Sequence, residues 1–527
     1  MDFKHIITNN KWLQFTLLLT FNIVIFILFA NIFPIRFLAN DDVVMAWIAD
    51  GVLSGIPDCH LIFMNAIYGS FLTLLYNIAP NIEWYSVCFS VFHVVAITII
   101  ISFFYKKIQN KIVRWVVICL YYLLWFRIIQ FFQFTTTTAM FAFAGILLFY
   151  NKKYIIGGTF LLISSMLRFD AMGLIGLLSI PLFIKSYRFE IKGYFPVVII
   201  LLIICGVHFS DKLFYQSTEW QEYREYNHYR SVINDSPNNW RMNESNLPES
   251  VSVENLKLLR NSIVDPCQIS NEDVKKMAEI IQNTPIVQKC RNLPYSIKHY
   301  QFYKLYLGVF LLMFILYVYI SEGRKRKIIM SFVFLLFIGV LCFISLNGNI
   351  KPRIIESVCF VLFSYVILLT DNEKPLFSKN GIVAIVPLLI SCGILIANEF
   401  VCMKDSQKST IGEQVQLIRN TENLKIVNIN HDFQCQLLSP FRLYDFPKQK
   451  MIPGGWLTKS PFCEIYSYKE LVDGDIVLFI KKGADISFLQ KAIEKNYDIE
   501  TEQCIISTTE HYAIVGLQSK QHEVFEK

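Results

Sequence analysis

The segment "FTLLLTFNIVIFILFANIF" (residues 15–33) is followed closely by "FLANDDVVMAWIADG" (residues 37–51). The first segment is an apolar run of about the length that an α-helix needs to cross a bilayer. It is too long for the apolar core of a signal peptide, and no convincing small-residue cleavage site follows it. We therefore expect a retained membrane helix, with two adjacent carboxylates, Asp41 and Asp42, just beyond its end.

The composition extends this pattern to the rest of the chain. Of its 527 residues, 54% are hydrophobic and 17% are charged, whereas soluble chains carry about 25% charged residues. The apolar residues form separated runs of near-spanning length. These predict an α-helical polytopic membrane protein with about eleven spans, placed at 13–33, 84–104, 113–129, 135–150, 154–168, 171–185, 194–210, 303–320, 328–346, 354–370 and 380–399.

Basic residues in the short loops predict the orientation of these spans. The basic segments all fall on one side of the predicted membrane, namely "YKKIQNK", "NKK", "KSYRFEIK" and "SEGRKRK". Because cytoplasmic loops are enriched in Lys and Arg, that side is expected to be cytoplasmic, together with the N-terminus. The loops 34–83 and 211–302 and the C-terminal segment are then extracytoplasmic, on a protein of the inner or plasma membrane.

We expect two domains, a membrane domain over residues 1–400 and an α/β domain over 401–527. The latter rests on strand-like "NLKIVNIN", "DIVLFIK" and "HYAIVGL" and helix-like "SFLQKAIEKN". The segment 209–233, "FSDKLFYQSTEWQEYREYNHYRSVI", is predicted to be one amphipathic helix that opens the second loop. Cys267 and Cys290 in that loop could pair, although spacing alone does not establish a disulfide.

Ionisable residues collect at the outer ends of the predicted spans and are almost absent from their interiors. They are Asp41, Asp42, Arg127, Arg168, Asp170, Lys351, Arg353 and Glu356. Adjacent carboxylates repel each other, so one of them is expected to have a raised pKa or to need a cation. A carboxylate can take a proton from a hydroxyl, and arginines bind phosphate through paired hydrogen bonds. The combination predicts a site for a phosphorylated lipid at the membrane surface.

Each of these residues also has a structural interpretation. Asp41 and Asp42 could cap the helix that follows them, and Arg168 with Asp170 could tie a tight hairpin. Lys351 and Arg353 could be interfacial anchors.

Other polar residues are equally open to two interpretations. Arg224 and Arg230 are expected on a solvated helix face, with substrate contact as the alternative, and His60 is expected at the surface. Gln133, ahead of the run Thr135–Thr138, could line a polar pocket or cap a helix. Trp456, in "MIPGGWLTKSP", could pack on a sugar ring or be buried.

The layout resembles the GT-C superfamily of polytopic glycosyltransferases, and especially its bacterial members. The resemblance lies in "NDDVVMAWIADG" after the first span, its continuation "SGIPDCHLIFMNAIYGSFLTLLYNIAPNIEWY", and "YNHYRSVINDSP" in the large loop after the seventh span. It implies transfer of a sugar, with inversion, from a polyprenyl-phosphate donor to a lipid-linked glycan or cell-surface polysaccharide on the non-cytoplasmic face.

The same resemblance implies residue roles. Asp41 looks like the general base, and Asp42 looks like its partner or a ligand for Mg²⁺ or Mn²⁺ in metal-dependent branches. Arg168 and Arg353 become candidates for the donor phosphate. The outer regions lack a WWD-type motif, which argues against protein N-glycosylation.

Other functions remain open on the sequence. A polymerase of polysaccharide repeat units would differ mainly in its donor. A lipid or oligosaccharide flippase or another transporter would be expected to carry charges or broken helices at mid-span, and neither is evident. A non-catalytic assembly protein would be indifferent to loss of Asp41 and Asp42. The sequence has no nucleic-acid-binding signature.

Overall fold

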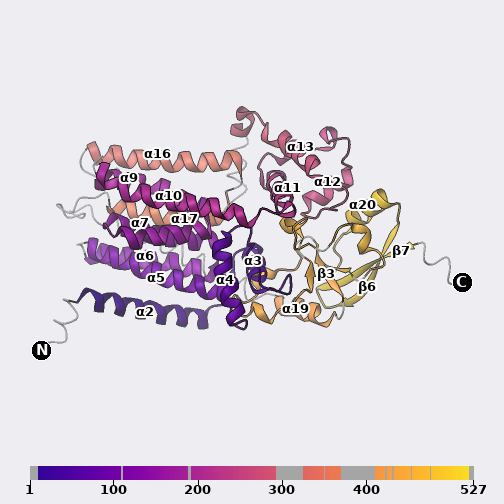
Figure 1. Ribbon diagram of the computed structural model, residues 1–527, viewed down its shortest axis with the longest axis horizontal. Coiled ribbons are helices and arrows are strands. Elements are labelled where there is room, and N and C mark those ends of the chain that lie inside the picture. Colours follow the sequence, from indigo (N-terminus) through magenta and orange to yellow (C-terminus); the bar gives the residue numbers. More distant parts are fainter. Residues whose placement is uncertain are drawn as a thin grey trace.

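The computed structural model describes most of the chain between residues 10 and 520. The described ranges are 10–108, 111–187, 191–291, 324–348, 350–368, 410–421, 424–429, 432–452, 454–463, 465–474 and 476–520. Long helices lie side by side in an elongated bundle, and shorter helices and a sheet gather at one end of it (Figure 1). The chain is thus a polytopic helical membrane protein with a small α/β region near its C-terminus.

The helices of the bundle confirm the predicted spans wherever the chain is described. They are α2 (Lys11–Ile32), α5 (Trp84–Lys107), α6 (Lys111–Gln130), α7 (Phe134–Tyr150), α8 (Tyr154–Leu167), α9 (Phe169–Tyr187), α10 (Ile191–Phe214), α16 (Arg324–Asn347) and α17 (Pro352–Leu368). Among the described residues, three segments are long and apolar enough to cross a membrane, namely Lys11–Ile32, Trp84–Lys107 and Tyr194–Phe214, and several shorter helices are also apolar. The spans predicted at 303–320 and 380–399 lie outside the described residues.

Close packing and interhelical hydrogen bonds hold the bundle together. A Cβ added at Gly157 of α8 would lie 2.9 Å from the carbonyl oxygen of Gly145 in α7, so only glycine permits this helix crossing. The buried Asn22 side chain of α2 donates to Thr98 Oγ1 of α5 (2.9 Å) and accepts from the Tyr122 hydroxyl of α6 (2.7 Å). Three helices are therefore joined through one amide.

The predicted first outer loop contains two helices, α3 (Asn40–Asp50) and α4 (Ala66–Ile78), at the end of the bundle (Figure 1). Helix α3 ends at Gly51, whose φ of 80° is a conformation that favours glycine. Just before α3, the two-residue strand β1 (Arg36–Phe37) pairs in parallel with β2 (Phe131–Phe132), the segment that joins α6 to α7. This pairing fixes the start of α3 beside the start of α7.

The second outer loop corrects one prediction. Residues 209–233 do not form one helix, because α10 continues to Phe214 and a new helix, α11 (Thr218–Asp235), starts after a break. Two further helices of this loop, α12 (Val253–Arg260) and α13 (Asn271–Gln282), lie beside α11 (Figure 1). The Cys267 thiol donates to the Tyr466 carbonyl oxygen (3.0 Å), and Cys267 and Cys290 are both free, so the two do not form a disulfide.

The C-terminal region contains a five-stranded mixed sheet in the order β4-β3-β5-β7-β6. Strand β3 (Lys425–Asn428) runs parallel to β4 (Met451–Ile452) and β5 (Ile476–Lys481), whereas β7 (Tyr512–Ser519) is antiparallel to β5 and β6 (Thr501–Thr508). Helix α20 (Ser487–Tyr497) agrees with its prediction, as do β3, β5 and β7. Helix α19 (Ile411–Asn420) precedes the sheet.

The C-terminal region is packed directly onto α3. Trp47 stacks on Phe446 with ring centroids 4.6 Å apart, and Gln449 N donates to the Val52 carbonyl oxygen (2.7 Å). Residues about four hundred positions apart in the sequence thus meet at one end of the bundle. Since the chain passes back and forth along the bundle, the basic end of α5 and the basic start of α16 lie at the opposite end (Figure 1).

A buried ion pair between α6 and α17 yields a test of this packing. Arg127 Nε lies 3.2 Å from Glu356 Oε1, and both side chains are buried. We expect Arg127→Met to lower the thermal stability of the detergent-purified protein, because a lone buried carboxylate costs about 3–5 kcal/mol. The double variant Arg127→Met/Glu356→Met should recover most of the loss. Equal melting temperatures for the single and double variants would contradict this account.

Candidate functional site

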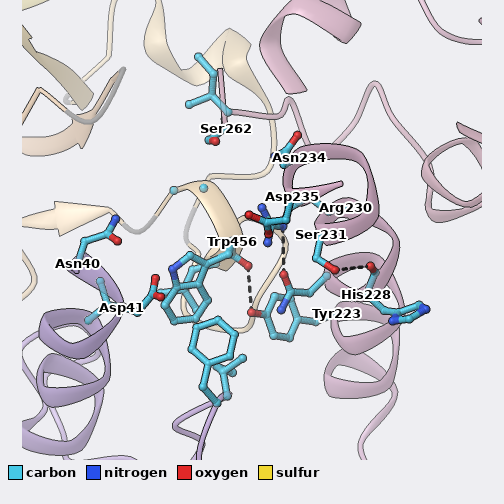
Figure 2. A pocket seen from close by; sticks show the side chains of 18 of the residues that line it. Asn40, Asp41, Tyr223, His228, Arg230, Ser231, Asn234, Asp235, Ser262 and Trp456 are labelled. Carbon is cyan, nitrogen blue, oxygen red and sulfur yellow. Dashed lines mark hydrogen bonds between the residues drawn. The ribbon is translucent and has the colours of Figure 1, made fainter. Parts of the chain in front are cut away.

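A cavity of about 840 Å³ lies where the bundle, the second outer loop and the C-terminal region meet. Its walls come from α3, α11, the segment before α17 and the turn between β4 and the 3-10 helix Gly455–Leu457. Figure 2 shows side chains of α3 and α11 facing each other across this space, with Trp456 between them. The sequence-predicted residues that line it are Asp41, Arg168, Arg224, Arg230, Lys351, Arg353 and Trp456.

Asp41 faces the cavity and pairs with Arg353. One oxygen of its carboxylate lies 3.4 Å from an Arg353 guanidinium nitrogen, and both side chains are largely buried but open to the cavity. Asp41 sits in the first turn of α3, where the helix dipole also favours a negative charge. The acid and the arginine come from positions about three hundred residues apart, so no local sequence pattern could have paired them.

Asp42 has the opposite environment. Its side chain is 0% exposed, and Oδ1 accepts hydrogen bonds from the Phe134 backbone N–H and the Tyr85 hydroxyl, both at 2.9 Å. Oδ2 is buried and finds no hydrogen-bond partner in the described part of the chain. Burial raises the pKa of Asp42 well above its usual range, and the neighbouring Asp41 charge adds to this effect. Asp42 therefore fixes α3 against α5 and α7, and it does not line the cavity.

Two arginines that line the cavity lie close to one aromatic ring, that of Phe134. The Arg168 guanidinium carbon lies 5.3 Å from the centroid of Phe134 and 5.5 Å from that of Phe63, and the Arg353 carbon lies 5.9 Å from that of Phe134. Arg168 also pairs with Asp170 at 3.4 Å. The rings hold the two guanidinium groups near each other and near Asp41, a cationic arrangement that suits a phosphate.

The opposite wall is formed by α11. Arg224 is exposed and stacks over Tyr215 (4.8 Å), whereas Arg230 is only 8% exposed. The expectation that both lie on a solvated helix face is therefore wrong for Arg230. Lys351 reaches Asp235 at the end of α11 (3.2 Å), which ties this wall to the segment that carries Arg353.

Trp456 lies at the floor between these walls. Its ring packs against Phe63 (4.6 Å between centroids), and its carbonyl oxygen accepts a hydrogen bond from the Tyr223 hydroxyl of α11 (3.0 Å; Figure 2). Trp456 is half-buried and lines the cavity. A partly open aromatic face beside hydrogen-bonding groups can pack against the apolar face of a sugar ring.

Besides Asp42, two further sequence candidates do not line the cavity. Gln133 is buried and caps α7, because its Oε1 accepts from the backbone N–H groups of Thr135 and Thr136 (2.6 and 3.2 Å). Asp170 is 80% exposed and reaches the site only through its ion pair with Arg168. Helix capping thus accounts for the position of Gln133, and the ion pair within a tight hairpin accounts for that of Asp170.

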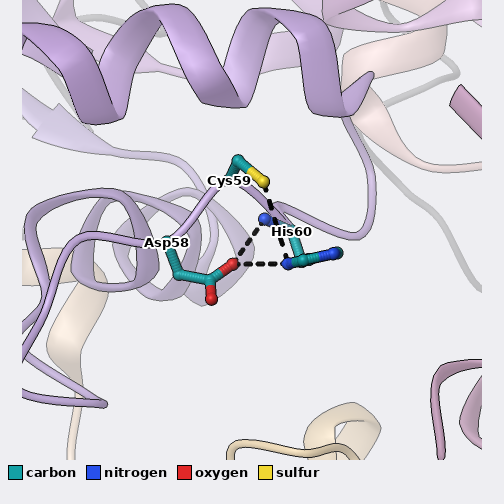
Figure 3. A group of neighbouring side chains, drawn as sticks. All are labelled: Asp58, Cys59 and His60. Atoms are coloured by element: carbon teal, nitrogen blue, oxygen red, sulfur yellow. Dashed lines mark hydrogen bonds and ion pairs between the residues drawn. The ribbon is translucent and has the colours of Figure 1, made fainter. Parts of the chain in front are cut away.

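A compact group of potential metal ligands lies outside the cavity. Asp58, Cys59 and His60 bring their ligand atoms within 4.8 Å of one another (Figure 3), and no such group that includes Asp41 or Asp42 occurs in the described ranges. His60 Nδ1 bonds to Asp58 Oδ1 (2.7 Å) and Nε2 bonds to the Phe214 carbonyl oxygen (3.0 Å). Because both partners are hydrogen-bond acceptors, each of the two ring nitrogens of His60 carries a proton.

Burial alone would lower the pKa of His60, but its hydrogen bonds, first of all the one to Asp58, raise it to about 10. A doubly protonated ring has no lone pair to offer a metal. The group is therefore best described as a clamp that joins the loop after α3 to the end of α10. His60 was expected at the surface, but its side chain is half-buried.

Several residues of the cavity were missed by sequence reasoning. Asn40, Asn227, Ser231, Asn234, Asp235, Arg260, Asn261, Ser262 and Asn428 all line it. Most are short amide or hydroxyl side chains in helix ends and turns, where such residues are common for structural reasons. Arg230 was already a sequence candidate, and it continues the spacing of Trp220, Tyr223 and Tyr226 along the buried face of α11.

Comparison with known proteins adds one structural likeness. No protein-family model matches the chain, and the search of curated proteins found no match. The chain aligns with the crystal structure of ArnT from Cupriavidus metallidurans bound to undecaprenyl phosphate, at 10% identity over 95% of this chain and 97% of that chain, with a TM-score of 0.38. A structural likeness of this size leaves the function open.

The environment of Asp42 predicts how stability depends on pH. Because its pKa is raised in the folded state, the unfolded chain ionises first, and stability falls as pH rises above the ordinary value of 3.8. Asp42→Asn keeps an acceptor oxygen for Phe134 and Tyr85 but cannot ionise. We expect it to melt close to wild type at pH 5 and above it at pH 8, measured by thermal unfolding.

Asp42→Ala should be destabilised at both pH values, because two buried donors lose their acceptor at about 1–3 kcal/mol each. Asp445→Asn, which alters an exposed acid, serves as the control and should follow wild type. A pH-independent difference between Asp42→Asn and wild type would show that the buried carboxyl does not titrate as inferred.

Proposed function

We propose that this chain is a membrane glycosyltransferase of GT-C type that transfers a sugar from a polyprenyl-phosphate donor to a lipid-linked glycan or a cell-surface polysaccharide, on the non-cytoplasmic face. The observation that carries the proposal is the Asp41–Arg353 pair in a cavity at the outer end of the bundle. It supplies an acid and a phosphate-binding cation at one place, next to the position expected for the membrane surface. The Mg²⁺ or Mn²⁺ alternative has no support from a cluster around Asp41 in the described residues.

The proposed reaction is a single displacement at the anomeric carbon. The acceptor hydroxyl oxygen forms the new bond to that carbon, and its proton passes to the Asp41 carboxylate. The bond between the carbon and the phosphate oxygen breaks, and the electron pair leaves with the lipid phosphate. Arg353 and Arg168 stabilise the charge that grows on the departing oxygen. Because the acceptor attacks the side of the anomeric carbon opposite the leaving phosphate, the proposed step inverts the anomeric configuration.

Donor binding also prepares the base. In the structure the Asp41 carboxylate is engaged by Arg353. A donor phosphate carries the stronger set of acceptor oxygens for a guanidinium and would compete for Arg353. Asp41 is then released toward the acceptor only when the donor is present, which limits wasteful reaction with water. The aromatic rings of Phe63 and Phe134 keep Arg168 in place during this exchange.

The opposite wall of the cavity suits an acceptor. Asn227, Ser231 and Asn234 of α11 present amide and hydroxyl groups, and Trp456 presents an aromatic face. These are the groups that bind sugar hydroxyls and sugar rings. A polymerase of repeat units would use the same wall for a growing glycan, and it would differ in taking a diphosphate donor.

The test is complementation of a deletion strain with variants expressed at equal level, with surface glycan composition as the measurement. We expect Asp41→Asn to lose glycan transfer by about 10²–10⁴-fold, the usual contribution of a general base. Arg353→Gln should reduce transfer strongly, and Arg353→Lys should retain part of it because the charge remains. The same variants can be assayed in vitro with synthetic polyprenyl-phosphate sugars.

Asp445→Asn is the matched control, since it removes a carboxylate of the outer region that does not line the cavity. It should restore glycan to the wild-type level. Full glycan with Asp41→Asn at equal expression would show that Asp41 is not the base, and a transport or assembly role would then be preferred.

A further inference from the structure

We propose that the outer half of the cavity contains a second anion-binding site, in which Arg230 binds a phosphate or carboxylate group carried by the acceptor. The identification of the bound anion as part of the acceptor rests on the proposed function, whereas the anion-binding site itself rests on the geometry of α11. The acceptor would accordingly be an anionic glycan or glycolipid and not a neutral one.

Arg230 lies on the buried face of α11. Trp220, Tyr223, Tyr226 and Ile233 form the rest of this face and are all buried. A helix face of this kind normally carries apolar residues alone. A guanidinium in their place costs free energy unless something pairs with it, because a buried charge without a partner is strongly disfavoured.

Within the described residues, no carboxylate pairs with Arg230. Its Nε donates to Asn227 Oδ1 of the previous turn (3.0 Å), a neutral acceptor. Asp235, on the same helix, pairs with Lys351 instead (3.2 Å). No ion pair of Arg230 occurs within the described part of the chain. Its two terminal nitrogens thus remain available to an anion in the cavity that Arg230 lines.

A second unpaired donor lies on the same wall. Asn234 Nδ2 is buried and has no hydrogen-bond partner among the described residues, although Asn234 lines the cavity one turn beyond Arg230. An amide N–H and a guanidinium that lack acceptors within one helical turn suit a group with several acceptor oxygens. Phosphate and carboxylate both meet this description.

This site is distinct from the one proposed for the donor. Arg353 and Arg168 are already associated with Asp41 and Asp170. Figure 2 shows Asp41 and Arg230 on opposite sides of Trp456, so a sugar on the Trp456 ring would lie between the two ends. An acceptor with its reactive hydroxyl near Asp41 could therefore place an anionic group at Arg230.

The shared chemistry is an oxyanion, and its two sources can be separated by small probes. Glucose 1-phosphate represents a phosphate-bearing acceptor, methyl glucuronide represents an acidic sugar, and methyl glucoside is the neutral control. Dissociation constants would be measured by titration calorimetry on the full chain in nanodiscs of phosphatidylcholine. We expect wild type to bind at least one anionic probe and to bind methyl glucoside at least about tenfold more weakly, since hydrogen bonds to charged groups are strong.

The variants then assign the site. Arg230→Gln should weaken anion binding by about tenfold or more, and Arg230→Lys should lose less because the charge is kept. Arg241→Gln changes an arginine of the same loop that does not line the cavity, and it should bind as wild type does. Melting temperatures of all variants show whether they are folded, and Arg230→Lys keeps the test decisive if Arg230→Gln unfolds.

The inference is overturned if wild type binds neither anionic probe, if Arg230→Gln and Arg230→Lys bind as wild type does, or if Arg353→Gln abolishes the same binding, which would mean a single anion site. Preference for one anionic probe identifies the acceptor class. The proposed function fails separately, if Asp41→Asn keeps full surface glycan while anion binding still depends on Arg230.

Discussion

The Asp42 carboxyl is the contact on which the geometry of the cavity depends. Through one oxygen it joins the first turn of α3 to the backbone at the start of α7 and to Tyr85 of α5. This contact turns the adjacent Asp41 away from the bundle and toward the cavity. It also fixes Phe134, whose ring lies beside both Arg168 and Arg353. The two neighbouring acids thus differ in environment: Asp42 is buried and hydrogen-bonded, whereas Asp41 faces the cavity.

A short segment at the start of α17 provides the matching cationic side. Lys351 pairs with Asp235 of α11, Arg353 with Asp41 of α3, and Glu356 with Arg127 of α6. One turn of helix and the residues before it therefore connect the outer loop, the candidate site and the bundle. A shift of this segment would alter all three contacts together, so the cationic side of the cavity is coupled to the packing of the membrane helices.

The sequence predicted what depends on local pattern and missed what depends on distant contact. Apolar runs of spanning length located the described helices of the bundle, and short strand-like apolar runs located β3, β5 and β7. Strand β6 was missed because only residues 504–506 within it are apolar and most of its side chains are exposed. Asp41 was singled out by its place after the first span, but only the folded chain separates it from Asp42. The break between α10 and α11 carries no proline or glycine that could have announced it.

The cavity carries a surplus of positive charge. Cations line both ends, and each acid that lines it, Asp41 and Asp235, is already paired with a cation. A surplus of positive charge in a partly enclosed space attracts anions more strongly than it would in bulk water. In the proposed reaction a sugar passes from one anionic substrate to another, and a separate cation beside each charge would offset their mutual repulsion. The aromatic face of Trp456, which lines the cavity, would then be left for the uncharged sugar ring.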